Sequence, residues 1–266
     1  METLKIIVCA KQVPDPEGPP SAFEVDAVNA RVTPRGIPPV LSPFDENALE
    51  AALKLKETAA AHITLMSAGS NLSMAVMLKA LATGADELVL IDDALFDREK
   101  LDSFATASLL SAAIRMHGDF DLVLTGRQAS DTNAGQVGLG IAALRGLPAV
   151  TLACSLKLEG DALLVERVLP EGYETVRVPL PAIVTVSHEI GELRYPRMAD
   201  IKAAKGLPQM KWGASDFNGE AATARRVKMI GVESPVRERN CQIVQADTPE
   251  EAGERLALAL REAKLL

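Results

Sequence analysis

Short apolar runs alternate with amphipathic stretches over residues 1–150 of the chain. The runs are rich in Val, Ile and Leu, as buried strands are, and the stretches between them repeat apolar residues every three or four positions, as helices do. This alternation predicts an α/β fold of the Rossmann-like, doubly wound kind, in which helices cover both faces of a mostly parallel sheet. The expected strands are residues 4–10, 62–69, 86–92, 120–126 and 148–156, and the expected helices are residues 42–57, 71–85, 101–118 and 133–145.

The helix signals at residue 42 illustrate how these boundaries are assigned. Ser42 is a favourable N-cap, Pro43 suits the first helical turn, and Asp45 stands at the spacing of a capping box. In the same way, Asn71 is expected to cap the next helix and Gly84 to stop it.

Residues 11–41 and the part of the chain after Thr151 depart from this rhythm. The first segment is rich in Pro and Gly, and a loop of this length is usually functional or forms a small excursion. The second predicts a β-rich insertion, with a hairpin around residues 159–161 and a last strand, 181–187, that rejoins the main sheet.

The C-terminal part of the chain is expected to be a separate arm. Residues 208–224 are polar and turn-rich, which indicates a linker, and the last segment is an amphipathic helix capped by Thr248, Pro249 and Glu251. We therefore expect a nucleotide-binding α/β domain at 1–206 and a linker and helical arm at 207–266.

Composition narrows the class of protein. The 266 residues are 48% hydrophobic and 24% charged, as in ordinary soluble proteins, and the net charge of −8 argues against a nucleic-acid partner. Cys9, Cys154 and Cys241 form no CxxC pair, so no metal site is expected, and their sparse use suits the reducing cytoplasm. No apolar run reaches the length of a membrane span, so no membrane insertion is expected.

The stretch "TGRQASDTNAGQVG", residues 125–138, is the candidate binding loop. Ligands of doubly wound sheets bind at the carboxyl ends of strands, and segments 9–12, 67–70 and 125 onward end at that edge. The N–H groups of a helix starting near Asn133 would favour a phosphate, and Arg127 would be the only nearby cation. Asp131 suits a ribose hydroxyl or a cap better than a phosphate. An ordinary capped polar loop explains the same residues, so the loop alone leaves both interpretations open.

Catalytic machinery is not evident in the sequence. His62, His117 and His188 are isolated, and no nucleophile–base pair is recognisable. The first strand is not followed by the glycine fingerprint of a Rossmann dehydrogenase. We therefore expect no catalytic residues, and a domain that holds a cofactor for a partner.

Five stretches in order resemble the β (small) subunit of electron transfer flavoproteins. They are "KIIVCAKQVPD", "SPFDENALEAALKLKE", "TGRQASDTNAGQVG", "VERVLPEGYETVRVPLPAIVTVS" and "RYPRMADIKAAK", and they span roughly Lys5 to Lys205. The resemblance implies a heterodimer with an α subunit that carries the redox-active FAD. It implies that the β subunit binds an adenine nucleotide, either a structural AMP or, in electron-bifurcating relatives, a second FAD that takes hydride from NADH.

The resemblance also implies site residues. Phe44 matches an aromatic near the α-subunit flavin, with packing at the start of its own helix as the alternative. Met198 matches the tip of a loop that recognises acyl-CoA dehydrogenases, with helix-start packing as the alternative. Motif matching places the nucleotide against Cys9, Ala10, Ser42, Pro43, Phe44, Asp45, Ala68, Gly126, Arg127, Gln128, Asp131, Thr132, Asn133, Ala134, Gly135, Gln136 and Val137.

The motifs are mixed between the two kinds of relative. "KQVPD" and "ENALE" look like the bifurcating kind and "SPF" like the simple kind, while the bifurcating loop pattern is broken at residues 132–134. AMP and FAD therefore stay open. We expect an electron carrier subunit rather than an independent enzyme. It would pass electrons between flavin dehydrogenases and an acceptor, and its C-terminal arm would wrap the α subunit. The alternative of another class is a stand-alone ATP- or AMP-binding module of the stress-protein kind.

Overall fold

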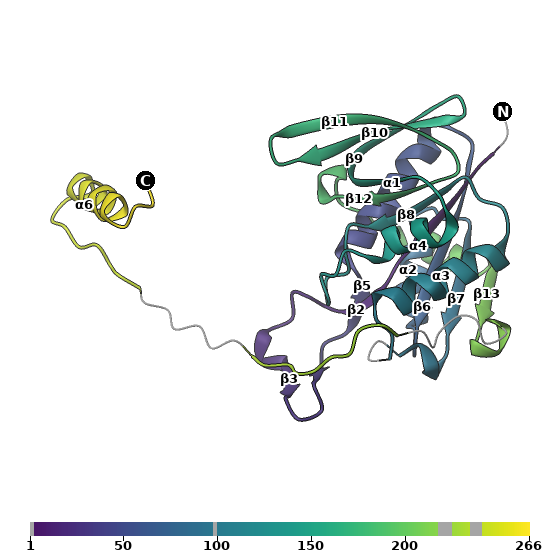
Figure 1. Ribbon diagram of the computed structural model, residues 1–266, viewed down its shortest axis with the longest axis horizontal. Coiled ribbons are helices and arrows are strands. Elements are labelled where there is room, and N and C mark those ends of the chain that lie inside the picture. Colours follow the sequence, from purple (N-terminus) through teal and green to yellow (C-terminus); the bar gives the residue numbers. More distant parts are fainter. Residues whose placement is uncertain (1–2, 98–99, 218–224, 235–240) are drawn as a thin grey trace. The chain divides into compact units, whose positions relative to one another are not determined.

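A nine-stranded sheet forms the centre of the first compact unit, Met1–Val232 (Figure 1). The computed structural model describes residues 3–97, 100–217, 225–234 and 241–266. The strands lie in the order β11-β10-β9-β12-β8-β1-β6-β7-β13, and those from β9 to β13 in this order are parallel. The sheet consists of β1 (Leu4–Cys9), β6 (Ala61–Gly69), β7 (Glu87–Asp92), β8 (Leu122–Gly126), β9 (Ala149–Glu159), β10 (Ala162–Leu169), β11 (Gly172–Pro179), β12 (Ala182–Val186) and β13 (Gln209–Trp212).

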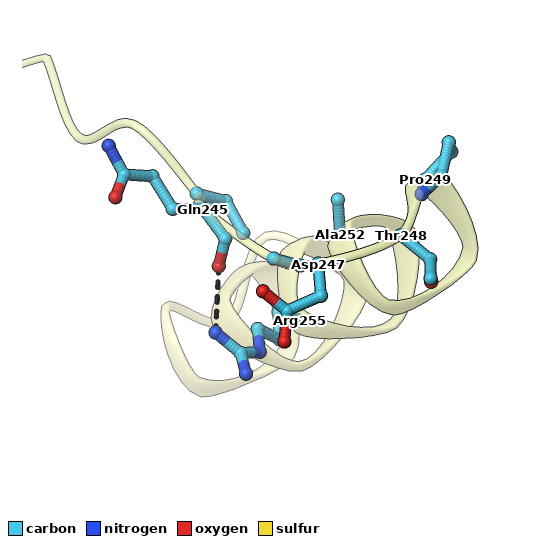
Figure 2. A pocket seen from close by; sticks show the side chains of 8 residues that line it. Gln245, Asp247, Thr248, Pro249, Ala252 and Arg255 are labelled. Carbon is cyan, nitrogen blue, oxygen red and sulfur yellow. Dashed lines mark hydrogen bonds between the residues drawn. The ribbon is translucent and has the colours of Figure 1, made fainter.

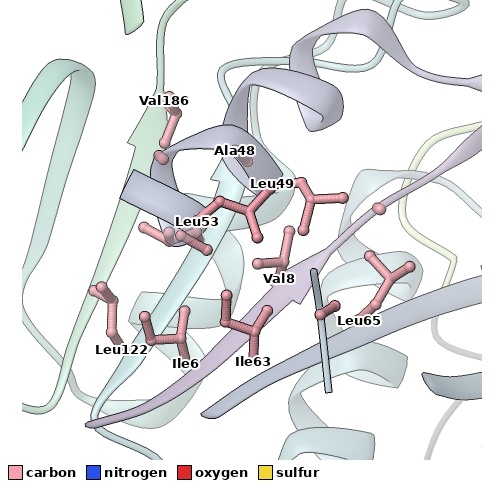
Figure 3. Close-up of a cluster of buried hydrophobic side chains, with 14 of the residues drawn as sticks. Ile6, Val8, Ala48, Leu49, Leu53, Ile63, Leu65, Leu122 and Val186 are labelled. Carbon is pink, nitrogen blue, oxygen red and sulfur yellow. The ribbon is translucent and has the colours of Figure 1, made fainter. Parts of the chain in front are cut away.

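Helices cover both faces of this sheet, which confirms the doubly wound α/β fold. Successive side chains of a strand point to opposite faces of the sheet, and each face has its own hydrophobic core. Ile6 and Val8 therefore pack in one core, and Ile7 and Cys9 pack in the other. Figure 3 shows the first core, where side chains of β1 and β6 meet those of the helix that starts at Pro43. This face carries α1 (Pro43–Thr58), α2 (Met74–Leu81) and α5 (Met198–Ala204), and the opposite face carries α3 (Ser103–His117) and α4 (Val137–Arg145).

The segment between β1 and α1 makes a small excursion, as its length suggested. Strand β2 (Gln12–Pro14) pairs with β5 (Pro39–Leu41), and β3 (Phe23–Asp26) pairs with β4 (Arg31–Pro34). Both pairs are antiparallel and separate from the main sheet.

The β-rich insertion follows the predicted path. Strands β9, β10 and β11 form an antiparallel meander, and β12 returns between β8 and β9, parallel to both. The predicted linker at 208–224 was wrong in one part, because β13 pairs with β7 at the edge of the main sheet. Residues 218–224 lie outside the described residues. The domain boundary expected after residue 206 stays a prediction, since a compact unit need not be a domain.

Two predicted helix starts were also wrong. Helix α2 begins after Ser73, and Asn71 lies outside it with a φ of 55°. Helix α4 begins at Val137 and not near Asn133, because Asn133 and Gly135 both adopt left-handed backbone conformations, with φ of 50° and 64°. The loop before α4 is therefore longer than the sequence suggested.

The second compact unit, Glu233–Leu266, contains helix α6 (Pro249–Glu262). Thr248 caps it by accepting a hydrogen bond from the Glu251 N–H at 3.2 Å, as predicted, although the Glu251 carboxylate reaches the Asp247 N–H and not that of Thr248. No residue of α6 is buried within the described structure. Among the described residues, no helix has the length and apolarity needed to cross a membrane.

Candidate functional site

The three strand ends expected to form the site are neighbours in the sheet. Strand β1 lies between β6 and β8, and Cys9 at its end stands opposite Met66 on one side and Thr125 on the other. The chain continues from β1 to β6 and β7 in one direction and later to β8 and β12 in the other, so the strand order reverses here. This is the topological switch point at which doubly wound sheets bind ligands.

The loop of residues 127–136 joins β8 to α4 at this edge. Within the loop, the Asn133 N–H donates to the Ala129 carbonyl at 2.8 Å and the Gln128 amide donates to the Asn133 side chain at 3.0 Å. No side chain caps the start of α4 at Gln136. No side chain therefore competes with an anion for the N–H groups of the first turn of α4, although the turn begins four residues later than predicted.

Gly126 and Gly135 require glycine for different reasons, one for lack of space and the other for its backbone conformation. A Cβ on Gly126 would stand 2.5 Å from the carbonyl carbon of Phe44, so this glycine lets β8 approach the start of α1. At Gly135 a Cβ would meet only the Arg127 carbonyl at 3.5 Å, and the φ of 64° itself favours glycine.

The buried side chain of Asp45 connects the end of β1 to the end of β8. One carboxylate oxygen accepts the Lys11 N–H at 2.8 Å and the other accepts the Gly126 N–H at 3.0 Å. The predicted capping box is therefore wrong, since this carboxylate accepts from Lys11, after β1, and from Gly126, in β8. The Ser42 N–H donates instead to the Lys11 carbonyl at 2.8 Å. Because the residue is only 6% exposed, burial raises the pKa of Asp45 to about 7 in spite of its two N–H donors. Burial and the nearby Asp45 likewise raise the pKa of Cys9 to about 12, which keeps this thiol protonated.

Lys11 places a second cation at this edge of the sheet, and its role was not predicted from the sequence. Its ammonium contacts both carboxylate oxygens of Asp131, at 2.7 and 2.8 Å. Arg127 was expected to be the only nearby cation, and the structure corrects this. The position of Lys11, directly after a buried strand that ends at the site, was the signal that could have identified it.

Arg127 lies over the ring of Phe44, with 4.6 Å between the guanidinium carbon and the ring centroid. This contact gives Phe44 a packing partner outside its own helix and holds the guanidinium in place. The Nε atom of Arg127 is buried and has no hydrogen-bond partner among the described residues.

Two serine hydroxyls near the strand ends are also without partners. The hydroxyl of Ser67, a fully buried residue near the end of β6, and that of Ser130, in the loop after β8, are buried and make no hydrogen bond within the described residues. Ser42 is fully buried as well, and its hydroxyl accepts the Ser130 N–H at 3.4 Å. Buried polar groups usually have partners, so these hydroxyls favour a polar ligand at this edge.

The structure thus gathers most of the predicted cofactor-binding residues around one edge of the sheet. Cys9 ends β1 and Ala10 follows it, and Ser42 directly precedes α1, which begins with residues 43–45. Ala68 lies near the end of β6, and residues 126–137 run from the end of β8 through the loop to the first residue of α4. Cys9, Ala10, Ser42 and Asp45 are buried beneath the surface of the edge, whereas residues 131–134 are exposed.

Met198 lies at the first position of α5 and belongs neither to the three strand ends nor to the loop after β8. It is 71% exposed, and Tyr195 beside it is 81% exposed, so neither packs into the core. At the start of α5 the Asp200 carboxylate accepts the Arg197 N–H at 3.1 Å and pairs with the Arg197 guanidinium at 2.9 Å. The exposure of Met198 argues against the alternative of helix-start packing.

Other hollows and clusters add nothing to this edge. Figure 2 shows a hollow within the second unit, where the Arg255 guanidinium donates to the Gln245 carbonyl at 2.7 Å. It is formed only by residues of the segment 244–255. Within the described ranges, no group of three or more His, Cys, Asp or Glu side chains could hold a metal ion.

Comparison with known proteins identifies the family of this fold. The electron transfer flavoprotein domain matches residues 31–216. The chain is 36% identical to the electron transfer flavoprotein subunit beta of Clostridium acetobutylicum, over 82% of each chain. It is 34% identical to the protein of the same name in Thermoanaerobacterium thermosaccharolyticum, over 93% of this chain and 94% of the relative. It is 36% identical to the caffeyl-CoA reductase-Etf complex subunit CarD of Acetobacterium woodii, over 80% of each chain.

Proposed function

The chain belongs to the electron transfer flavoprotein family as a β subunit, and from this membership we propose that it binds an adenine nucleotide and works in a heterodimer with an α subunit. The α subunit would carry the redox-active FAD. The heterodimer would pass electrons from flavin dehydrogenases of the acyl-CoA dehydrogenase type to an acceptor. The chain itself would be a carrier subunit of the cytoplasm and not an independent enzyme.

The observation that carries the nucleotide proposal is the set of unpartnered donors at the switch-point edge. The hydroxyls of Ser67 and Ser130 and the Nε of Arg127 are buried without partners in the described structure, at the edge of the sheet where the uncapped α4 also begins. Hydroxyl and guanidinium donors beside helix N–H groups suit phosphate oxygens. Lys11 and Asp131 would then face the sugar–phosphate part of the ligand, one as a cation and one as an acceptor for ribose hydroxyls.

Phe44 and Met198 extend this proposal to electron transfer. Phe44, stacked with Arg127, would lie toward the α-subunit flavin. Met198, exposed at the start of α5, would dock the dehydrogenase, because an exposed apolar side chain between charged neighbours suits a docking anchor.

The second candidate is the electron-bifurcating form, in which the nucleotide is a second FAD that oxidises NADH. The stretches "KQVPD" and "ENALE" and the likeness to a subunit of a caffeyl-CoA reductase-Etf complex favour it. Both forms use the same edge, so they differ in the ligand and not in the site.

Counting nucleotides in the purified heterodimer tests the proposal. The chain is co-expressed with its α subunit, and FAD and AMP are extracted and quantified by chromatography. One FAD and one AMP per heterodimer would support the simple carrier, and two FAD without AMP would support bifurcation. A chain that purifies without a flavin-bearing partner and without a nucleotide would overturn the proposal.

A pair of glycine variants tests the site itself. Gly135→Val should abolish nucleotide retention, because the side chain would stand where backbone meets phosphate. Gly160→Val is the matched control, since Gly160 has the same φ of 64° but lies in the hairpin between β9 and β10, with open space around it. Equal nucleotide content in the two variants would refute the assigned loop.

A further inference from the structure

The stretch that leads from β12 to Met198 is fastened along one face of α1. Residues 191–197 of this stretch form neither a helix nor a strand. The Asn47 amide donates to the Gly191 carbonyl at 2.7 Å, and the Lys54 ammonium donates to the carbonyl of Ile190. Asn47 and Lys54 are seven positions apart, which is close to two helical turns, so they lie on the same face of α1. Side chains of a helix therefore hold the backbone of a segment that has no regular structure of its own.

Arg194 makes the most extensive contact between this stretch and α1. Its Nε donates to one oxygen of Glu50 at 3.1 Å, and one terminal nitrogen donates to the other oxygen at 2.7 Å. The second terminal nitrogen donates to Glu57 at 2.6 Å. The backbone N–H of Arg194 also donates to Glu50, at 3.1 Å. The Glu50 carboxylate thus fixes both the side chain and the main chain of Arg194.

The pair of Glu50 and Arg194 lies largely away from water. Glu50 is only 5% exposed. Burial by itself raises the pKa of Glu50, but the hydrogen bonds and the charge of Arg194 outweigh it, so the pKa lies below its usual value. The carboxylate is therefore ionised at neutral pH. A two-pronged pair of this kind holds its geometry more firmly than an exposed ion pair does.

The backbone is anchored on both sides of the exposed Met198. Pro196 is buried before it, and Ala204, at the end of α5, is buried in the core after it. The Lys79 ammonium of α2 lies 4.8 Å from the ring centroid of Tyr195. Met198 itself is 71% exposed. An exposed apolar side chain is therefore carried on a backbone that is held in place.

A simpler explanation covers part of these contacts. A buried carboxylate needs a cation beside it, and Arg194 supplies that cation to Glu50. This need does not account for Asn47 and Lys54, which hold carbonyl groups of the same stretch from the same face of α1. The contacts together restrain the position of the stretch.

We propose that Arg194 is a positioning residue for the docking of the dehydrogenase: by holding residues 191–197 on α1, it presents Met198 in one fixed conformation. The inference rests on the docking role proposed for Met198. A docking residue that is already ordered loses less conformational entropy when the partner binds, so the affinity rises without any new contact. In this role Arg194 acts through Met198 and does not itself touch the dehydrogenase.

Steady-state reduction of the heterodimer tests this role. The chain, assembled with its α subunit, is the substrate of an acyl-CoA dehydrogenase from the organism that encodes it, and its KM and kcat are measured. Arg194→Gln should raise the KM about fivefold and leave kcat within about twofold, because docking and not electron transfer is weakened. Arg194→Lys should raise the KM by less, because lysine keeps the charge but cannot form the two-pronged pair.

Lys56→Gln is the matched control. Lys56 also belongs to α1, and its ammonium pairs with Asp86, before β7, at 2.6 Å. The side chains of Lys56 and Arg194 are similarly exposed, at 31% and 38%. This variant loses one cation and one ion pair of α1 without touching residues 191–197, so its KM should equal that of the natural chain.

The same substitution in a Met198→Ala background separates positioning from a general loss of stability. With the positioned side chain removed, Arg194→Gln should change the KM by less than about twofold. A general destabilisation would raise the KM by the same factor in both backgrounds. Should Arg194→Gln fail to fold, Arg194→Lys takes its place in both backgrounds, because its charge still balances the buried Glu50.

The outcomes distinguish this inference from the proposed function. A higher KM in Met198→Ala together with an unchanged KM in the Arg194 variant would overturn the positioning role and leave the docking role intact. Equal factors in the two backgrounds would also overturn it, and so would an equal rise in Lys56→Gln. An unchanged KM in Met198→Ala would overturn the docking role itself, and the inference with it.

Discussion

The buried carboxylate of Asp45 should make the stability of this protein depend on pH in a way that one substitution removes. Its two oxygens accept N–H groups from Lys11 and Gly126, and these bonds favour the ionised form. Burial opposes ionisation and is the stronger effect, because it raises the pKa of Asp45 from 3.8 to about 7. The substitution Asp45→Asn keeps the shape of the side chain and removes its titration.

The sign and size of the effect follow from the pKa change. A carboxyl group with a raised pKa in the folded state contributes stability that is fully present below its unfolded pKa of 3.8 and is lost as the pH rises to about 7. At about 1.4 kcal/mol per pH unit, the full change is about 4 kcal/mol. Between pH 5 and pH 8, the loss is about 2 to 3 kcal/mol, since part of the titration of the unfolded chain lies below pH 5.

Urea unfolding at pH 5, 6, 7 and 8 measures this change. The free energy of unfolding of Asp45→Asn should rise relative to that of the natural chain by about 2 to 3 kcal/mol from pH 5 to pH 8. Asp161→Asn is the matched control, because the Asp161 side chain is 94% exposed in a hairpin turn, and its difference from the natural chain should stay constant. A constant difference for Asp45→Asn as well would refute the reasoning that burial outweighs the two N–H donors.

Three further substitutions test the packing at Gly126, the ion pair of Lys11 and the exposed Met198. Gly126→Ala should lower the free energy of unfolding by about 2 to 3 kcal/mol in urea, because the new Cβ meets the backbone of Phe44, which cannot move aside without shifting α1. Lys11→Met should lower it by about 1 kcal/mol at most at low salt and by less at high salt, since the ion pair with Asp131 is partly exposed; a loss that does not change with salt would contradict this. Met198→Ala should leave the free energy of unfolding within about 0.5 kcal/mol of the natural value but reduce kcat/KM for electron transfer from a dehydrogenase about tenfold, and an unchanged kcat/KM would contradict the docking role.

Local sequence patterns were sufficient to predict the fold but not the contacts within the candidate site. The alternation of strands and helices predicted the doubly wound sheet, because the period of apolar residues is a property of neighbouring positions. The sequence around Asp45 resembled a capping box for the same local reason. The carboxylate of Asp45 instead accepts from N–H groups 34 and 81 residues away, and no local sequence pattern predicts these contacts. The pair of Lys11 and Asp131 is separated by 120 residues.

Strand β13 was missed for a different physical reason. It lies at the edge of the sheet and its residues are alternately exposed and half-buried, so the sequence "QMKW" contains no apolar run. The start of α4 was misplaced because Asn133 and Gly135 adopt left-handed conformations, which the sequence permits without requiring. Edge strands and loop conformations depend on the rest of the fold, whereas buried strands can be recognised from their own apolar sequence.

Helix α1 contacts both of the regions proposed to be functional, the switch-point edge and the segment before Met198. Near its start, Asp45 accepts hydrogen bonds from Lys11, after β1, and from Gly126, at the end of β8, at the candidate nucleotide site. Farther along, the Asn47 amide donates to the Gly191 carbonyl at 2.7 Å, and the Glu50 carboxylate accepts from the Arg194 guanidinium at 2.7 Å. These two residues are three positions apart, so they lie on one stripe of the helix and fix the segment that leads to Met198. A helix of 16 residues, about 24 Å long, is stiff on this scale. The candidate nucleotide edge and the segment that leads to Met198 are therefore both attached to one rigid element.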